Sequence, residues 1–440
     1  RYLLTFTGRY DGASQFSENN KWSFFPSGAF SWNVSNEEFY PQNPVLSSLK
    51  VRTSYGLTGN QGIGAYQSLA RISSTFFVMN NSVVSSVRPT SIANKDLTWE
   101  KTSQFNIGLD MDLFNNRINI SGDYYYKLTK DLLFNVPIPA FSGYQNRLQN
   151  LGEIENKGVE LQINSRNLVN AFKWSTSLNL TFNRNKVLSL PGGVDIIIAS
   201  VPGVSGSVQN SILREGEAVG SFYGYVYNGV YQVGDEFIPG GTFEKVPGGE
   251  KYADLNNDGV LDSRDRKIIG NPNPRAVWGL NNDFSFKGFS MNIFFQAFTG
   301  GDMMNLVRME LDRLSGNSNA TTDALRRWTP QNTDTDVPKA AAGRSPLTST
   351  RFVEDGSFVR LKNISLGYDL SPGLLSRFKI RSARIYLSGQ NLLTFTKYSG
   401  VDPEVAFRSD GATNSNVNLG LDFDSYPNTT SWTLGINLGF

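Results

Sequence analysis

Two residue types are missing from this 440-residue chain, which contains no cysteine and no histidine. Without cysteine there are no disulfides, thiolate metal sites or thiol catalysis, and the absence also fits, weakly, a compartment in which stray thiols are oxidised. Without histidine the chain lacks the usual general base near neutral pH and the commonest ligand of transition metals. Ser-His-Asp hydrolysis and histidine-ligated zinc are therefore excluded.

Long apolar runs and a strong net charge are also missing. Mean hydropathy is −0.30, and the stretch richest in apolar residues, 289–298, is broken by Ser290, Asn292 and Gln296. It falls well short of the ~18 apolar residues of a membrane-spanning helix. The 41 Lys and Arg balance the 39 Asp and Glu and are scattered, so we expect no nucleic-acid partner.

What the chain does contain is alternation of apolar and polar residues, with 30 Phe, 18 Tyr and 42 Gly. Its clearest case is 432–440, where every even position is apolar and every odd position is small or polar. This period of two is typical of a strand with two unlike faces. One face of such a strand could meet lipid while the other meets a wet lumen.

The same alternation predicts two hairpins. Strand 105–113 is followed by 118–126 across Asn115-Asn116, and strand 280–286 by 289–298 across Lys287-Gly288. Further strands are expected at 2–10, 28–34, 49–57, 158–165, 172–182, 358–370 and 380–390. We expect about 13 strands in all, each near the ~9 to 11 residues with which a tilted strand crosses a bilayer.

Short turns alternate with long connections. The long connections are predicted at about 129–157, 185–276, 299–354 and 391–426. This asymmetry is typical of outer-membrane barrels, which have short periplasmic turns and long extracellular loops. A soluble β-sandwich or propeller is the alternative, and it predicts that Leu434, Ile436 and Leu438 point into a core. Aromatic residues near the strand ends, such as Trp22 and Trp174, favour the membrane barrel.

Five segments resemble the SusC/RagA branch of the TonB-dependent outer-membrane transporters. They occur in the order of that family and cover nearly the whole chain. The segments are 152–167 (GEIENKGVELQINSRN), 216–232 (GEAVGSFYGYVYNGVYQ), 254–292 (beginning DLNNDGVLDSRD), 358–370 (FVRLKNISLGYDL) and 385–405 (IYLSGQNLLTFTKYSGVDPEV).

The resemblance implies an all-β fold, a transmembrane antiparallel barrel of about 22 strands, of which residues 1–440 are the C-terminal part. The plug domain and the first strands would lie outside this chain. The chain opens directly on a strand-like run without a signal peptide, so we expect the true N-terminus upstream. An isolated partial sheet would leave two unpaired edges in lipid, and the missing strands must therefore come from elsewhere.

The resemblance also implies a function, which is active import of large nutrients, oligosaccharides or oligopeptides. The implied partners are a SusD-like surface lipoprotein, TonB, outer-membrane lipid and the glycan or peptide substrate. The implied location is the outer membrane of a Gram-negative bacterium of the Bacteroidota. No enzyme is expected. Two alternatives stay open: a barrel that serves as a structural or secretion-associated subunit, and a soluble β-rich binding protein.

One segment has the pattern of a calcium loop. Its oxygen donors occupy loop positions 1, 3, 5, 7, 9 and 12, with Gly259 at position 6. The predicted ligands are Asp254, Asn256, Asp258, the Val260 carbonyl, Asp262 and Asp265. Asp265 replaces the usual glutamate at position 12. The expected cofactor is a structural Ca²⁺, and an Asx-rich turn that needs no metal is the alternative.

A run of tyrosines gives the weakest candidates for substrate binding. Tyr223, Tyr225, Tyr227 and Tyr231 alternate within a glycine-punctuated segment. Aromatic rings can stack on sugars, which makes glycan contact one reading of this pattern. The alternative is a loop hairpin that packs its own aromatic rings together.

Overall fold

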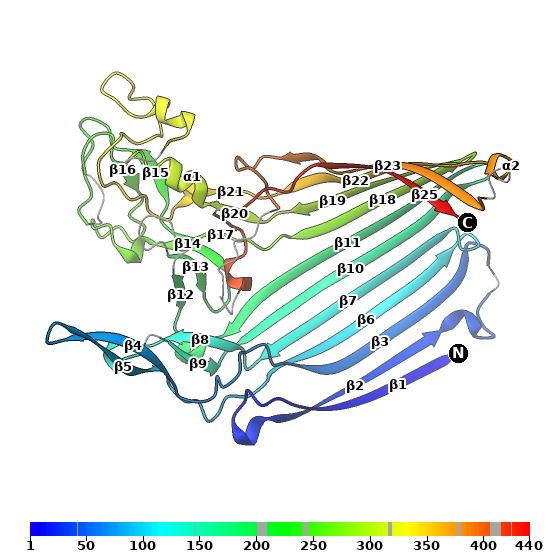
Figure 1. Cartoon of the computed structure of the whole chain (residues 1–440), viewed down its shortest axis with the longest axis horizontal. Coiled ribbons are helices and arrows are strands. Elements are labelled where there is room, and N and C mark those ends of the chain that lie inside the picture. Colours follow the sequence, from blue (N-terminus) through cyan, green and yellow to red (C-terminus); the bar gives the residue numbers. More distant parts are fainter. Residues whose placement is uncertain are drawn as a thin grey trace. The chain divides into compact units, whose positions relative to one another are not determined.

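The computed structural model describes residues 1–41, 43–144, 146–199, 209–240, 245–315, 319–375, 380–404, 415–423 and 425–440. Its largest sheet has twelve strands in the order β1-β2-β3-β6-β7-β10-β11-β18-β19-β22-β23-β25 (Figure 1). These strands are β1 (Tyr2–Gly12), β2 (Trp22–Asn33), β3 (Leu46–Asn60), β6 (Glu100–Leu113), β7 (Ile118–Lys130), β10 (Glu153–Val169), β11 (Phe172–Ser189), β18 (Ala276–Phe286), β19 (Phe289–Thr299), β22 (Phe358–Asp369), β23 (Ser382–Thr396) and β25 (Ser431–Gly439). The all-β prediction is confirmed, with twelve strands in this sheet where about 13 were expected.

Both predicted hairpins are present. Phe286 pairs with Phe289, and Lys287 and Gly288 between them have φ of 45° and 85°, as a two-residue turn of type I′ requires. The other hairpin pairs Leu113 with Ile118. Its connection is therefore the four residues 114–117 rather than the Asn115-Asn116 pair alone. Positive φ at Phe114, Asn115 and Asn116 permits this four-residue reversal.

The chain divides into two compact units. Unit 1 comprises 1–165, 181–196 and 214–216, and unit 2 comprises 166–180, 197–213 and 217–440. In unit 1, strands β1, β2, β3, β6, β7 and β10 follow one another. Consecutive strands join at one end by short connections such as 114–117, which we call the short-turn end; the opposite end is the long-connection end.

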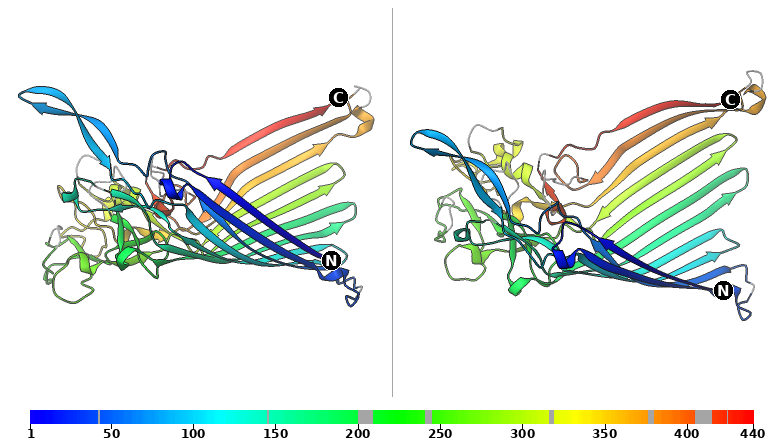
Figure 2. Two further views of the ribbon diagram at one scale, coloured as in Figure 1. Left: turned by 90° about the horizontal axis from the view of Figure 1, so that it is seen from below. Right: turned by 60° about the horizontal axis from the view of Figure 1, so that its bottom comes forward.

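Two hairpins that the sequence did not predict are inserted at the long-connection end of unit 1. They are β4 (Arg71–Met79) with β5 (Ser82–Ser91), and β8 (Leu133–Pro137) with β9 (Asn146–Asn150). The β4–β5 hairpin extends well beyond the ends of β3 and β6 (Figure 2). Phe16, Phe25, Leu97 and Trp99 form a buried apolar cluster, which anchors the connections before and after these strands onto the sheet.

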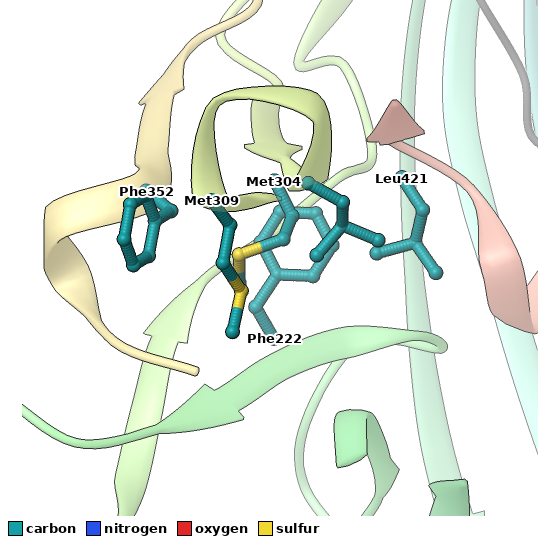
Figure 3. Packing of buried hydrophobic residues seen from close by; sticks show 6 residues of the cluster. Phe222, Met304, Met309, Phe352 and Leu421 are labelled. Carbon is teal, nitrogen blue, oxygen red and sulfur yellow. The ribbon is translucent and has the colours of Figure 1, made fainter. Parts of the chain in front are cut away.

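In unit 2 the long connections fold into small sheets of their own. The strands are β12 (Ile196–Ala199), β13 (Gln209–Leu213), β14 (Ser221–Gly224), β15 (Tyr227–Val230), β16 (Glu250–Tyr252), β17 (Lys267–Gly270), β20 (Asp302–Asn305), β21 (Val353–Asp355) and β24 (Leu421–Asp422). The predicted connections at 185–276, 299–354 and 391–426 therefore contain regular structure, and β11 and β23 also run past the expected strand ends. A buried core of Phe222, Met304, Met309, Phe352 and Leu421 joins these segments (Figure 3).

Among the described residues, helices are few and short. The α-helices are α1 (Leu306–Leu311) and α2 (Pro372–Leu375), and 3-10 turns lie at Glu18–Asn20, Val34–Asn36, Ala140–Ser142, Pro191–Gly193, Ser263–Asp265, Thr322–Arg326, Thr350–Phe352 and Ser415–Asn418. Within the described part of the chain, no helix has the length and apolar character needed to span a membrane.

Candidate functional site

One face of the unit 1 strands carries apolar side chains at matching positions. Leu4 pairs with Phe30, and Tyr124 pairs with both Ile107 and Val159. These five side chains are between 37% and 66% exposed, although soluble monomers rarely expose contiguous apolar patches above a few hundred Å². The face therefore requires an apolar surrounding.

The opposite face of the same strands is charged. The Arg52 guanidinium lies 2.8 Å from the Asp110 carboxylate and 2.9 Å from the Asp123 carboxylate, and the Ser121 hydroxyl donates to Asp110 over 2.7 Å. Half-exposed ion pairs of this kind add little stability, and their charges would be expensive in hydrocarbon. This face therefore meets water.

The strands of unit 2 also carry an exposed apolar face. Leu366 pairs with Leu387, which pairs in turn with Leu434, and all three side chains are exposed. In β25, Leu434, Ile436 and Leu438 are 74%, 64% and 51% exposed. The interpretation as a soluble β-rich binding protein is therefore wrong, because it required these residues to fill a core.

An ion cluster fixes the long-connection end of β22. The Arg360 side chain, only 2% exposed, donates to the Asp402 carboxylate and, from Nη1 over 2.7 Å, to Glu404. Lys362, which has no partner on β19 because the register between β19 and β22 shifts there, donates to Glu404 over 2.8 Å. Burial tends to raise the pKa of Asp402, but Arg360 and the backbone N–H groups of Glu404 and Asn428 hold that pKa below its ordinary value.

A second buried ion cluster centres on Asp312. The Arg308 and Arg351 guanidinium groups lie 3.4 and 3.5 Å from its carboxylate, and the Thr321 hydroxyl donates to it over 2.6 Å. Arg308 also pairs with Glu354 at 3.0 Å. Buried charges are tolerated only when paired and hydrogen-bonded, so this cluster fixes the geometry of the connections.

Two of the four tyrosines predicted to contact sugar are buried. Tyr231 has no exposed surface and packs on Phe237, with 4.9 Å between the ring centroids. Tyr223 is 8% exposed, and the Arg266 guanidinium lies 4.5 Å from its ring centroid. These rings pack the loop against itself, as the alternative interpretation predicted, and present no face to a sugar.

The other two tyrosines are half-buried. The ring centroids of Tyr225 and Tyr227 both lie 5.7 Å from that of Tyr252. The Tyr227 hydroxyl donates to the Asp336 carbonyl over 2.6 Å and accepts from Arg351 over 3.0 Å. Burial raises the pKa of both phenols. Sugar contact by these two residues stays a prediction.

The predicted calcium loop is closed by hydrogen bonds to its own backbone. The Asp254 carboxylate accepts from the Gly259 N–H over 2.8 Å, and Gly259 has a φ of 75°. The Asn256 side chain accepts from the Asp258 N–H, and the Asp258 carboxylate from the Val260 N–H. The last two hydrogen bonds close Asx turns, as the non-metal alternative stated above expects.

The second half of this loop is held by Asp265 and Arg264. Asp265 is fully buried, and its carboxylate accepts from the Leu255 and Asp262 N–H groups over 2.9 and 2.8 Å. Arg264 lies 2.6 Å from the Asp258 carboxylate and 2.8 Å from the Asp262 carboxylate. Its hydrogen bond to Asp262 keeps the pKa of that carboxyl below the ordinary value.

No three Asp, Glu, His or Cys side chains of the described residues converge as a metal site requires. One carboxylate oxygen of Asp254 is nevertheless buried without a hydrogen-bond partner. Calcium binding would require Arg264 to leave Asp258 and Asp262, and it stays a prediction.

The sequence did not predict the ion clusters around Arg360 and Asp312, nor a cavity of about 400 Å³ whose lining includes Arg71, Arg88 and Arg147. Alternation shows which face of a strand a residue occupies, but not which distant loop supplies its partner. The sequence contains one signal of the ion cluster around Arg360: the charged Lys362 interrupts the alternation of apolar and polar residues in β22.

A sheet of long antiparallel strands with one exposed apolar face and one charged face defines a membrane-spanning β-barrel protein. Residues 1–392 match the family described as TonB dependent receptor-like, beta-barrel. The chain therefore belongs to this family.

Individual relatives agree with this membership. The chain is 49% identical to the TonB-dependent receptor P3 of Formosa agariphila over 445 residues, with all of this chain and 44% of the relative covered. It is 34% identical to the TonB-dependent receptor SusC of Bacteroides thetaiotaomicron, again over the whole chain and 42% of the relative. The chain thus spans less than half the length of these relatives.

A solved structure supports the fold. The solved structure of the RagAB peptide transporter matches the whole chain, over 46% of its own chain, with a TM-score of 0.84 and 30% identity. The resemblance to the SusC/RagA branch, drawn from five sequence segments, is confirmed.

Proposed function

We propose that the complete protein is a TonB-dependent importer in the outer membrane of a Gram-negative bacterium of the Bacteroidota. The observation that carries this proposal is the pair of unlike faces on long antiparallel strands, apolar at Leu366 and Leu387 and charged at Arg52 and Asp110. Membership of the TonB-dependent receptor family and relatives from Formosa and Bacteroides support it.

The proposed cargo is a large nutrient, an oligosaccharide or oligopeptide, delivered with a SusD-like surface lipoprotein. Its support is the likeness to SusC and to the RagAB peptide transporter. We further propose that a plug domain, the first barrel strands and the TonB-contacting segment belong to the complete protein outside residues 1–440. The relatives are more than twice as long as the region matched here.

The experiment is uptake by cells that carry or lack the gene. Cells with the gene should accumulate a fluorescent oligosaccharide or oligopeptide, and removal of TonB should abolish accumulation while the barrel remains equally abundant. A lipoprotein should co-purify with the complete protein. Uptake that does not change on loss of the gene or of TonB would favour the second candidate, a structural or secretion-associated barrel.

We also propose that the 254–265 loop binds a structural Ca²⁺. Support comes from the spacing of its oxygen donors and from the buried, unpartnered oxygen of Asp254. The ion would be held by Asp254, Asn256, Asp258, the Val260 carbonyl, Asp262 and Asp265. It would stiffen the connection and take no part in catalysis.

A further inference from the structure

A cavity of about 400 Å³ in unit 1 is lined by the base of the β4–β5 hairpin and by the segment around β9 (Figure 1 labels both hairpins). Three of its lining residues are arginines: Arg71 at the start of β4, Arg88 on β5 and Arg147 on β9. None of its lining residues is acidic. We call this cavity the arginine pocket.

None of these three arginines forms a salt bridge with an acidic side chain of the described residues, and Arg71 and Arg147 lie against neutral side chains. Arg71 donates to the Gln67 side chain over 3.0 Å and to the Ser91 hydroxyl over 3.2 Å. Arg147 lies 3.1 Å from the side-chain amide of Gln149. By contrast, Arg52 and Arg360 each meet two carboxylates.

Three like charges around one cavity repel one another, and an anion placed between them would relieve that repulsion. A guanidinium group is a planar fork of donors that fits the two oxygens of a carboxylate or sulfate. The remaining walls include Pro89, Tyr144 and Leu148, which suit the apolar part of a small ligand. The volume lies within the range of small-molecule sites.

We propose that the arginine pocket binds a carboxylate or sulfate group of an acidic solute outside the cell, carried on an oligosaccharide or a peptide. The proposal rests on the proposed function, since it names the chemistry of the cargo. A lipid headgroup is the less suitable occupant. The pocket lies in inserted hairpins beyond the strand ends, and none of its lining residues belongs to the apolar row of Leu4, Phe30 and Ile107.

The test is direct binding to the complete protein purified in detergent, measured by titration calorimetry. The acidic probes are tetragalacturonate, sulfated maltotetraose and tetraglutamate, and the neutral controls are maltotetraose and tetraglutamine. At least one acidic probe should bind, and the double variant Arg88→Gln, Arg147→Gln should weaken its binding about tenfold or more. The acidic probe that binds identifies sugar or peptide as the source of the anion.

Arg117→Gln is the matched control, because Arg117 is an exposed arginine in the turn at the short-turn end. This variant should bind the acidic probe with the affinity of the unmodified protein. Heat-modified gel mobility shows that each variant is folded. Vesicles of lipopolysaccharide serve as a lipid probe. The proposal is overturned if no acidic probe binds, or if the double variant binds the acidic probe as tightly as the unmodified protein does. It is also overturned if the double variant loses binding to the vesicles alone.

Binding and import can fail separately. A protein that binds an acidic probe through Arg88 and Arg147 but does not import would contradict the proposed function and leave the pocket standing. A protein that imports nutrients but binds no acidic probe would contradict the pocket alone.

Discussion

Arg52 on β3 reaches across β6 to Asp123 on β7, with 2.9 Å between the guanidinium and the carboxylate. The residue between them is Gly108, which pairs with Arg52 on one side and Asp123 on the other. A β-carbon at position 108 would lie 2.2 Å from an Asp123 oxygen and 2.9 Å from the Arg52 guanidinium carbon. The missing side chain therefore makes this three-strand contact possible.

Gly108→Ala should displace Arg52 from Asp123 and lower the thermal midpoint of the folded barrel. The expected cost is about 1 to 3 kcal/mol, the usual range for an overpacked site. Gly122→Ala is the control, because a β-carbon there meets only Leu161, at 3.8 Å. Gel mobility after stepwise heating reports both midpoints, and equal midpoints would show that the space at Gly108 is not needed.

The apolar face can be tested with two adjacent residues of β23. Leu387→Arg places a charge on the face assigned to lipid, at a cost of about 2 to 4 kcal/mol near the bilayer centre. Ser388→Arg places the same charge on the opposite face and should assemble nearly normally. The measurement is the amount of folded protein in outer-membrane fractions. Equal amounts for the two variants would contradict the assignment of the faces.

Much of the sheet could be predicted from local sequence. In a strand whose two faces have unlike surroundings, apolar and polar residues alternate with a period of two. A tight turn is marked by residue types such as glycine and asparagine that adopt positive φ. The Lys287-Gly288 hairpin is an example. The β4–β5 hairpin was missed although Asn80 and Asn81, both with positive φ, separate two β-branched runs. Its exposed apolar residues occur on both faces, so its alternation is weak.

The small sheets and the ion clusters could not be predicted, because their contacts join residues far apart in the chain. Met304 on β20 pairs with Leu421 on β24, and Arg360 meets Asp402 from a separate connection. No local period encodes such partners. The tyrosine run was ambiguous for a related reason. Its pattern allowed both sugar contact and packing, and the sequence does not show which rings are buried, as Tyr231 is.

Removal of the buried charge of Arg360 should lower the stability of the fold far more than removal of the charge of Lys362. Arg360→Met leaves Asp402 without its main partner and should cost about 3 to 5 kcal/mol. Lys362→Met leaves Glu404 paired with Arg360 and should cost about 1 kcal/mol or less. Thermal midpoints measure both costs, and similar values would show that Arg360 is not needed to neutralise Asp402.

Two buried aspartates should make stability respond to pH in opposite directions. The lowered pKa of Asp402 stabilises the fold above the ordinary aspartate value of 3.8, and this contribution is lost as the pH falls through the lowered pKa. Burial raises the pKa of Asp422, and the charges of Asp402 and Glu354 add to that effect. Stability from Asp422 is therefore present below 3.8 and lost as the pH rises through its raised pKa.

Asp402→Asn should accordingly lower the thermal midpoint at pH 7, with a penalty that shrinks in acid. Asp422→Asn should raise the midpoint at pH 7, with a gain that disappears in acid, and its amide oxygen can still accept from Tyr398. Thermal midpoints of the two variants and the unmodified protein over a series of pH values give the comparison. A pH-independent difference for either variant would contradict the assigned direction of its pKa.

The calcium loop gives a competition between two cations. Arg264 holds the Asp258 and Asp262 carboxylates, so Ca²⁺ must displace it in order to bind there. Arg264→Ala should therefore bind Ca²⁺ more tightly than the unmodified protein, and Asp258→Ala should bind it more weakly, because one ligand is lost.

Protection of the 254–265 loop from protease over a Ca²⁺ titration measures both affinities, with Mg²⁺ as the control ion. Mg²⁺ should protect poorly, because it demands a smaller octahedral site and dehydrates reluctantly. If Ca²⁺ protects neither the unmodified protein nor Arg264→Ala, the loop is an Asx-rich turn that Arg264 closes without any metal.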